Sequence, residues 1–178
     1  MHSSTCSMLA ATSLIVLQVV GSTVASGAPD VRIPPDRVTA IAFSVDGKFV
    51  AAGRQSGSVV VWDVMNGQAR VALNEYKRPI DAVVFAPDGK ALAITGYDAS
   101  AKSVPLWDVN TGKSLGRIGK GSGISYVSFS KDGDAVALGL VRSVQLVDRK
   151  SGGSRRFNVS SDIAVCVAFS PDGNMLAT

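Results

Sequence analysis

The chain has 178 residues, a net charge of +4 and a hydrophobic content of 46%, values that fit one packed domain and exclude a disordered segment. His2 is the only histidine, so neither a histidine-based catalytic triad nor a histidine zinc site is expected. Cys6 and Cys166 provide no disulfide framework and no paired spacing for a metal. We therefore expect no metal, no cofactor and no catalytic residue.

The first 25 residues differ in composition from the rest of the chain. No Asp, Glu, Lys or Arg precedes Asp30, and residues 8–20 form a mostly apolar run followed by small residues up to Ala25. This pattern predicts a signal peptide over residues 1–25 and an exported protein. Because no basic residue precedes the run, a misassigned start, an additional buried strand and a cytoplasmic location stay open as alternatives. Polar residues within the run argue against a membrane span.

One short pattern then occurs four times. Its phenylalanines, which are spaced 42, 44 and 40 residues apart, are Phe43, Phe85, Phe129 and Phe169. A period of about 40–45 residues is typical of a β-propeller blade. An Asp-Gly pair follows each phenylalanine and predicts a tight turn, because Gly supplies a positive φ and Asp tolerates it. We therefore interpret the four repeated aspartates as turn formers and not as a ring of catalytic carboxylates. They are Asp46, Asp88, Asp132 and Asp172.

Each repeat predicts four strands. A β-branched residue two positions before each phenylalanine shares a face with it, since strand side chains alternate. An alanine occupies the same place in every second strand, which indicates a repeated packing site. The third strands end at Asp63, Asp108 and Asp148, and short fourth strands follow. We predict an all-β fold, a β-propeller of four-stranded antiparallel blades within residues 26–178. The predicted blades are about 38–73, 80–118, 124–159 and a partial fourth over 164–178.

The Trp62-Asp63 and Trp107-Asp108 pairs, together with the Phe-Ser-Pro-Asp-Gly turn, resemble WD40 repeats. The resemblance covers residues 30–178 and implies that each tryptophan is buried between blades. These repeats depart from the WD40 pattern because Gly-His pairs are missing and the usual aspartate before the third strand is replaced. The residues at those aspartate positions are Ser56, Ala101 and Val141, and Val147 takes the place of the third tryptophan. TolB-like propellers, which also use Ser-Pro-Asp-Gly turns, remain an alternative family.

Three complete blades and half of a fourth are fewer than a closed propeller needs, because closure takes about four to eight blades. An open array exposes an unpaired strand edge. We therefore expect the sequence to be part of a larger propeller, with further blades of the same longer chain as neighbours. Completion of the ring by self-association is the alternative.

Two other segments have compositions that suggest anion binding. Residues 119–123 are rich in glycine but lack the strand-loop-helix context of a P-loop, so we interpret them as the link between two blades. A basic cluster in the third repeat either holds an anionic partner or is an ordinary solvated surface. Its members are Arg142, Arg149, Lys150, Arg155 and Arg156. Because aromatic residues are not interleaved with these cations, we do not expect nucleic-acid binding.

A candidate partner-binding patch comes from the first inter-blade link and the longer loop of the second repeat. Tyr76 and Arg78 lie in the link, and Tyr97 and Asp98 lie in the loop. In WD40-like propellers these two segments share one rim. Exposed Tyr and Arg are frequent interface anchors.

The resemblance implies a non-catalytic scaffold that binds another protein. Fold alone does not dictate function, so this is a statement about a class of proteins. The alternative is a sensor or substrate-gating propeller domain of an exported enzyme whose catalytic part lies beyond Thr178.

Overall fold

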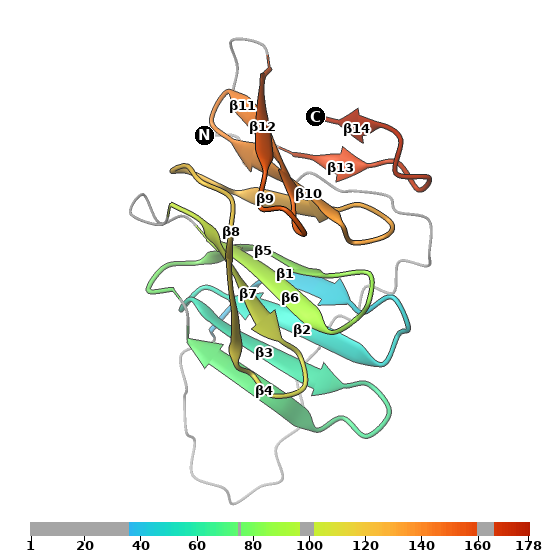
Figure 1. Ribbon diagram of the computed structural model, residues 1–178. Helices are drawn as coiled ribbons and strands as arrows, with labels where there is room; N and C mark the ends of the chain where they lie inside the picture. The colour runs from blue at the N-terminus through green and yellow to red at the C-terminus, as the bar shows by residue number, and fades with distance from the viewer. Residues whose placement is uncertain (1–35, 75, 97–101, 160–165) are drawn as a thin grey trace, which may run out of the picture. The chain divides into compact units, whose positions relative to one another are not determined.

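The computed structural model describes residues 36–74, 76–96, 102–159 and 166–178, and every regular element among them is a β-strand (Figure 1). The first blade consists of β1 (Val38–Phe43), β2 (Phe49–Arg54), β3 (Ser58–Asp63) and β4 (Ala69–Asn74). The second consists of β5 (Ile80–Phe85), β6 (Ala91–Gly96), β7 (Val104–Asp108) and β8 (Ser114–Ile118). The third consists of β9 (Tyr126–Phe129), β10 (Ala135–Leu140), β11 (Ser143–Asp148) and β12 (Ser154–Asn158). A last antiparallel pair is formed by β13 (Ala168–Phe169) and β14 (Leu176–Ala177).

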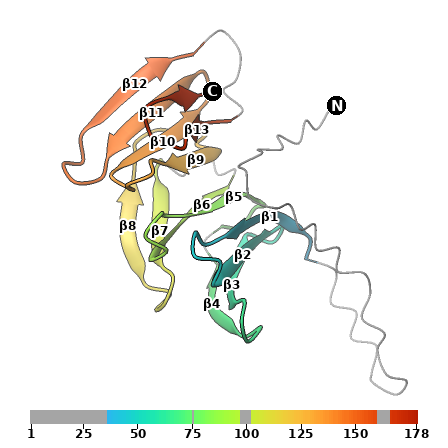
Figure 2. The same cartoon turned by 90° about the vertical axis from the view of Figure 1, so that its right-hand side faces the viewer.

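Within each sheet the strands are antiparallel and lie in chain order, which is the topology of a propeller blade. The all-β prediction is therefore confirmed. The innermost strands of successive blades contact one another, β1 with β5, β5 with β9 and β9 with β13 (Figure 2). The expected leader, residues 1–25, lies outside the described residues.

In all four Asp-Gly turns, the backbone N–H two residues after the aspartate donates to its Oδ1. Three of the turns add a serine hydroxyl, as the first one shows. The Ser44 hydroxyl donates to Asp46 Oδ1 at 2.7 Å, and the backbone N–H of Lys48 donates to the same oxygen at 3.1 Å. These two bonds, with that of Ser44 first, lower the pKa of Asp46 to about 2. Gly47 has a φ of 69°, which an L side chain rarely adopts. The interpretation of the repeated aspartates as turn formers is thus confirmed.

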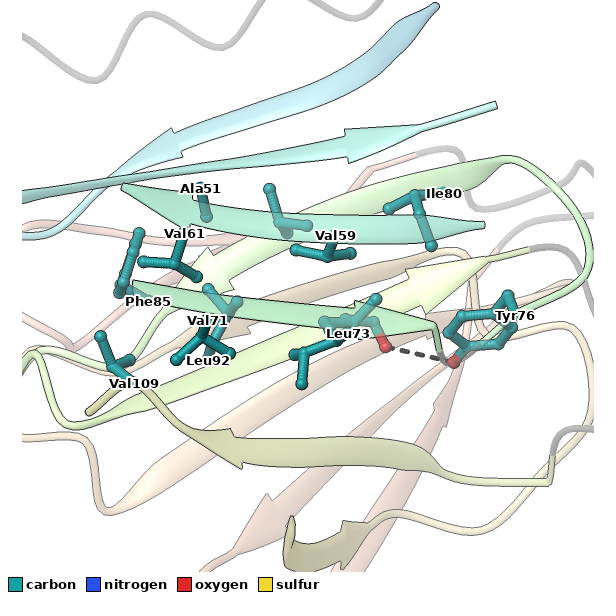
Figure 3. Packing of buried hydrophobic residues seen from close by; sticks show 12 residues of the cluster. Ala51, Val59, Val61, Val71, Leu73, Tyr76, Ile80, Phe85, Leu92 and Val109 are labelled. Atoms are coloured by element: carbon teal, nitrogen blue, oxygen red, sulfur yellow. Dashed lines mark hydrogen bonds between the residues drawn. The ribbon is translucent and has the colours of Figure 1, made fainter. Parts of the chain in front are cut away.

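The core lies between consecutive blades. We call the side of a blade that packs on the preceding blade its front face, and the opposite side its back face. The back face of the first blade and the front face of the second form one buried cluster (Figure 3). The back-face members are Ala51, Val59, Val61, Val71 and Leu73, and the front-face members include Ile80, Val83, Phe85, Leu92 and Ile94.

The recurring alanine of the second strand belongs to the back face. Ala51, Ala93 and Ala137 are each 0% exposed, and each lies in a cluster that joins two blades. A larger side chain at this position would push the following blade away, because protein interiors are close-packed. The structure thus accounts for the alanine in the second strands of the three four-stranded blades.

The tryptophans differ from the prediction. Trp62 and Trp107 are only half-buried, whereas Val147, at the equivalent position, is 5% exposed. Each tryptophan stands next to last in its third strand, close to the turn where the sheet meets solvent. Although Trp107 packs against the first core cluster, its indole N–H is buried without a hydrogen-bond partner. A buried donor left unpaired costs about 1–3 kcal/mol.

Replacing Trp107 tests this assignment. Trp107→Phe removes the unpaired N–H and keeps most of the ring packing, so we expect its free energy of unfolding to change by less than about 1 kcal/mol. Trp107→Ala removes the packing as well and should lower that free energy by about 3 kcal/mol. Urea denaturation of both variants measures the difference. Equal losses in the two variants would show that the N–H has a partner in solution.

Candidate functional site

The two ends of the sheets differ in kind. One end carries the Asp-Gly turns and the turns between third and fourth strands, and we call it the turn rim. The other end, the link rim, carries the loops between second and third strands and the links from one blade to the next. Its described segments are residues 55–57, 76–79, 102–103, 119–125 and 141–142.

Each inter-blade link is tied to the loop between the second and third strands of the blade it leaves. The backbone N–H of Tyr76 donates to the Gly57 carbonyl at 3.4 Å. In the second blade the N–H of Gly121 donates to the carbonyl of Lys102 at 2.9 Å. In the third blade the N–H of Val159 donates to the carbonyl of Arg142 at 3.3 Å. Links and loops therefore share one rim, as the resemblance implied.

Tyr76 does not lie on an exposed patch, so that part of the prediction is wrong. It is 8% exposed, and its phenol donates to the Ile94 carbonyl at 3.2 Å (Figure 3). The ring belongs to the core cluster between the first two blades. A tyrosine in a link fits this place because its apolar ring fills the core while its hydroxyl satisfies a buried carbonyl. Tyr76 thus anchors the link to the core between the first two blades.

Arg78 is exposed, as expected, and so is Lys77 beside it. Tyr97 and Asp98 lie outside the described residues. The loop that contains them leaves β6 at Gly96, where an added Cβ would lie 3.0 Å from the Pro79 carbonyl oxygen. The structure therefore brings the start of this loop against the link that carries Arg78.

The charges of the described residues are distributed unequally between the rims. Most carboxylates lie on the turn rim, namely Asp46, Asp63, Asp88, Asp108, Asp132, Asp134, Asp148 and Asp172. The described carboxylates of the link rim are Asp36 and Asp81, and Asp36 is engaged with the Ser56 hydroxyl at 2.7 Å. The cations of the link rim or directed to it include Arg54, Lys77, Arg78, Lys102, Lys120, Arg142 and Arg156. The described link rim is therefore positive, which favours an anionic partner.

The basic cluster read from the third repeat is divided by the fold. Arg149 and Lys150 lie on the turn rim, where the Lys150 ammonium is 2.5 Å from Asp134 Oδ2. Arg142 lies at the opposite end of the same sheet, in the turn between β10 and β11. The cations that sequence proximity grouped together thus belong to two surfaces. Strand β11 separates them, because it runs from one end of the sheet to the other between Arg142 and Arg149.

No group of three or more His, Cys, Asp or Glu side chains that could hold a metal occurs among the described residues. In the same part of the chain, no helix is long and apolar enough to cross a membrane.

The front face of the first blade is open. Val38, Ile41 and Phe43 are 56%, 62% and 57% exposed, whereas the equivalent Ile80 and Phe85 of the second blade are 1% and 6% exposed. The sequence repeat makes these positions of the first and second blades equivalent. They are buried only where a preceding blade packs on them. Exposed apolar side chains grouped on one sheet face are typical of an interaction surface.

A matched pair of substitutions measures this difference. Phe85→Ala should lower the free energy of unfolding by about 3–5 kcal/mol, because a buried ring is lost from the core. Phe43→Ala should cost less than about 1 kcal/mol in the 178-residue chain, because its ring is largely in water. Urea denaturation with sedimentation analysis gives both values and the oligomeric state. A similar cost at Phe43 would indicate that a second copy covers this face in solution.

Comparisons with known proteins agree with the blade architecture. A family model described as nucleolar protein 10-like, N-terminal domain, matches residues 7–149, which is most of the chain. The chain therefore belongs to this β-propeller family. The curated relatives of the chain also confirm its resemblance to WD40-repeat proteins.

The curated relatives share limited identity and only part of their length. The chain is 29% identical over 102 residues to small ribosomal subunit protein RACK1y of Oryza sativa subsp. japonica, covering 57% of this chain and 30% of the relative. It is 25% identical over 111 residues to periodic tryptophan protein 2 of Arabidopsis thaliana, covering 61% and 12%. It is 22% identical over 113 residues to B-type cell cycle switch protein ccs52B of Medicago truncatula, covering 58% and 23%. The match thus spans less than a third of each of these relatives. WD40 relatives support a protein-interaction scaffold in general terms and give no support to the exported-enzyme alternative.

Proposed function

We propose that the chain is a non-catalytic scaffold that binds another protein through its link rim, around Arg78. The observation that carries this proposal is the contrast between the buried Tyr76 and the exposed Lys77 and Arg78 that follow it. Tyr76 fixes the backbone of the link, so the two cations start from a rigid base. A preorganised arginine loses less conformational entropy on binding, which favours affinity.

Tyr97 and Asp98 complete the proposed patch with Arg78. The proximity of Gly96 to Pro79 supports this grouping, because the loop that contains both residues begins there. Tyr76 has a different role in the revised patch: it positions the link and does not contact the partner. The positive charge of the described link rim favours a partner with an acidic surface.

We further propose that a further blade of a longer chain covers the open front face of the first blade. The second and third blades provide the support, since each packs the equivalent face on its predecessor. Val38, Ile41 and Phe43 would then be core residues of a larger propeller. Self-association through the same face is the competing arrangement.

Finally, we propose that the scaffold works inside the cell. The match to the family begins at residue 7, inside the expected leader, which supports an N-terminal segment that belongs to the domain. The names of the family and of the RACK1y relative refer to the nucleolus and the ribosome, which are intracellular. This is the cytoplasmic alternative of the sequence interpretation.

Substitutions in the patch test the scaffold function. Arg78→Ala and Tyr97→Ala should each weaken binding of a protein partner by about tenfold or more, because interface anchors of these types contribute about 2 kcal/mol. Quantitative pull-down from the native host, with melting temperature measured in parallel, gives binding and folding separately. Lys90→Ala on the turn rim is the matched control and should leave the bound proteins unchanged. Equal recovery of every protein by wild type, Arg78→Ala and Tyr97→Ala would remove the patch.

A further inference from the structure

A second feature of the link rim lies on the third blade, away from Arg78. It is a surface hollow of about 460 Å³, which we call the third-blade hollow. Its lining consists of Gly121, Ser122 and Gly123 from the link, Leu140, Val141 and Ser143 from the β10–β11 hairpin, and Arg156 of β12. Three segments that are distant in the sequence thus converge on one hollow.

The glycine-rich link beside the hollow is held in place. The side-chain oxygen of Gln145, a residue 5% exposed, accepts from the N–H of Lys120 at 2.9 Å. Arg156 Nη2 donates to the Lys120 carbonyl at 2.9 Å. A Cβ added at Gly121 would overlap the Leu140 side chain and lie 3.0 Å from Arg156 Nη2. The two peptide groups that flank the Lys120 Cα are therefore both fixed, one through its N–H and the other through its carbonyl. The glycine at 121 leaves room for the Leu140 side chain.

Arg142 stands in the hairpin turn beside the hollow, in a conformation that glycine prefers. Its φ is 61°, and it is the only described residue other than glycine with a positive φ. The left-handed conformation is higher in free energy for a residue that carries a Cβ than it is for glycine. Retained strain of this kind is found preferentially at functional positions. Arg142 stands between Val141 and Ser143, which both line the hollow.

The charge around the hollow is of one sign. Its lining contains Arg156 and no carboxylate, and Arg142, Lys120 and Lys102 belong to the turn, link and loop beside it. Two other hollows differ: one on the third blade includes Asp148, and one between the third blade and the β13–β14 turn includes Asp132 and Asp172. The described carboxylates of this blade all lie on its turn rim. The positive charge of the third-blade hollow is therefore not neutralised by described residues of its own blade.

We propose that the third-blade hollow binds the oxyanion of an acidic or phosphorylated side chain in a protein partner, which rests on the scaffold function proposed above. Guanidinium groups recognise carboxylates and phosphates through paired charge-assisted hydrogen bonds. The hydroxyls of Ser122 and Ser143 add donors to the same hollow. Leu140 and Val141 supply an apolar wall for the stem of a side chain.

A protein ligand fits these residues better than RNA. Single-stranded nucleic acid is held by aromatic side chains on which bases stack, in addition to basic residues. The lining of the third-blade hollow contains no aromatic residue. The hollow therefore offers charge and a short apolar wall, which a peptide side chain uses and a base does not.

Peptide binding to the complete 178-residue chain tests the proposal. Three fluorescein-labelled peptides of one sequence would carry glutamate, phosphoserine or glutamine at the same central positions, and a poly-uridine oligonucleotide would serve as the RNA probe. We expect the glutamate or the phosphoserine peptide to bind at least tenfold more tightly than the glutamine peptide, by fluorescence anisotropy at 150 mM salt. The tighter of the two acidic peptides identifies the source of the oxyanion.

Variants locate the binding. Arg156→Gln and Arg142→Gly should each weaken the acidic peptide by about tenfold, because one charge-assisted contact is lost. Arg142→Gly should at the same time raise the melting temperature, since it relieves the left-handed strain, so its loss of binding cannot result from unfolding. Arg155→Gln is the matched control, because neighbouring strand residues point to opposite faces and Arg155 lines a different hollow.

The outcomes separate this proposal from the scaffold function. Unchanged affinity in Arg142→Gly and Arg156→Gln, or an equal loss in Arg155→Gln, would overturn the third-blade hollow as the site. Tighter binding of poly-uridine than of either acidic peptide, lost in the same two variants, would overturn a protein ligand. The pull-down with Arg78→Ala depends on the first link and reports on the scaffold function independently of either result.

Discussion

The packing of each blade's front face on the back face of the blade before it is the constraint on which the rest of the structure depends. A four-stranded sheet of this length buries little by itself, and the clusters between blades contain most of the fully buried side chains. The repeated alanine of the second strand and the β-branched residues of the first strand both serve this contact. Repeat proteins are stabilised in this way, through the interfaces between neighbouring units.

The same packing positions the link rim. Tyr76 is at once a member of the core between the first two blades and the residue before the exposed Lys77 and Arg78. In the third blade, Gln145 of β11 accepts a hydrogen bond from the Lys120 N–H and so fixes the link that precedes this blade. Stability and presentation of the proposed binding surface are thus coupled, because the residues that close the core also hold the links.

The sequence predicted the blades well because their signals are local and repeated. The Asp-Gly turns, the alternating strands and the alanine of the second strand each depend on neighbours within one repeat or on the adjacent repeat. The burial of Tyr76 was missed because the exposure of a link residue depends on which blades pack against it. An aromatic ring in a link is compatible both with a place in the core and with an exposed interface. Trp107 was placed too deep because the family pattern, rather than its position near the end of β7, decided the prediction. The third-blade hollow combines residues 121, 141 and 156, and no local pattern joins them.

The most direct test of the inter-blade contact uses two residues from different blades. A Cβ added at Gly53 of β2 would lie 2.7 Å from Ile80 Cβ of β5, closer than two side chains can pack. Gly53→Ala should therefore destabilise the protein strongly. Ile80→Ala removes Cγ2, the closest atom of the opposing side chain, but keeps Cβ, so it should relieve part of that loss. A double-mutant cycle by urea denaturation should give a coupling of at least about 1 kcal/mol, with the double variant more stable than the sum of the single variants predicts. Strictly additive losses would contradict the front-to-back packing of the first two blades.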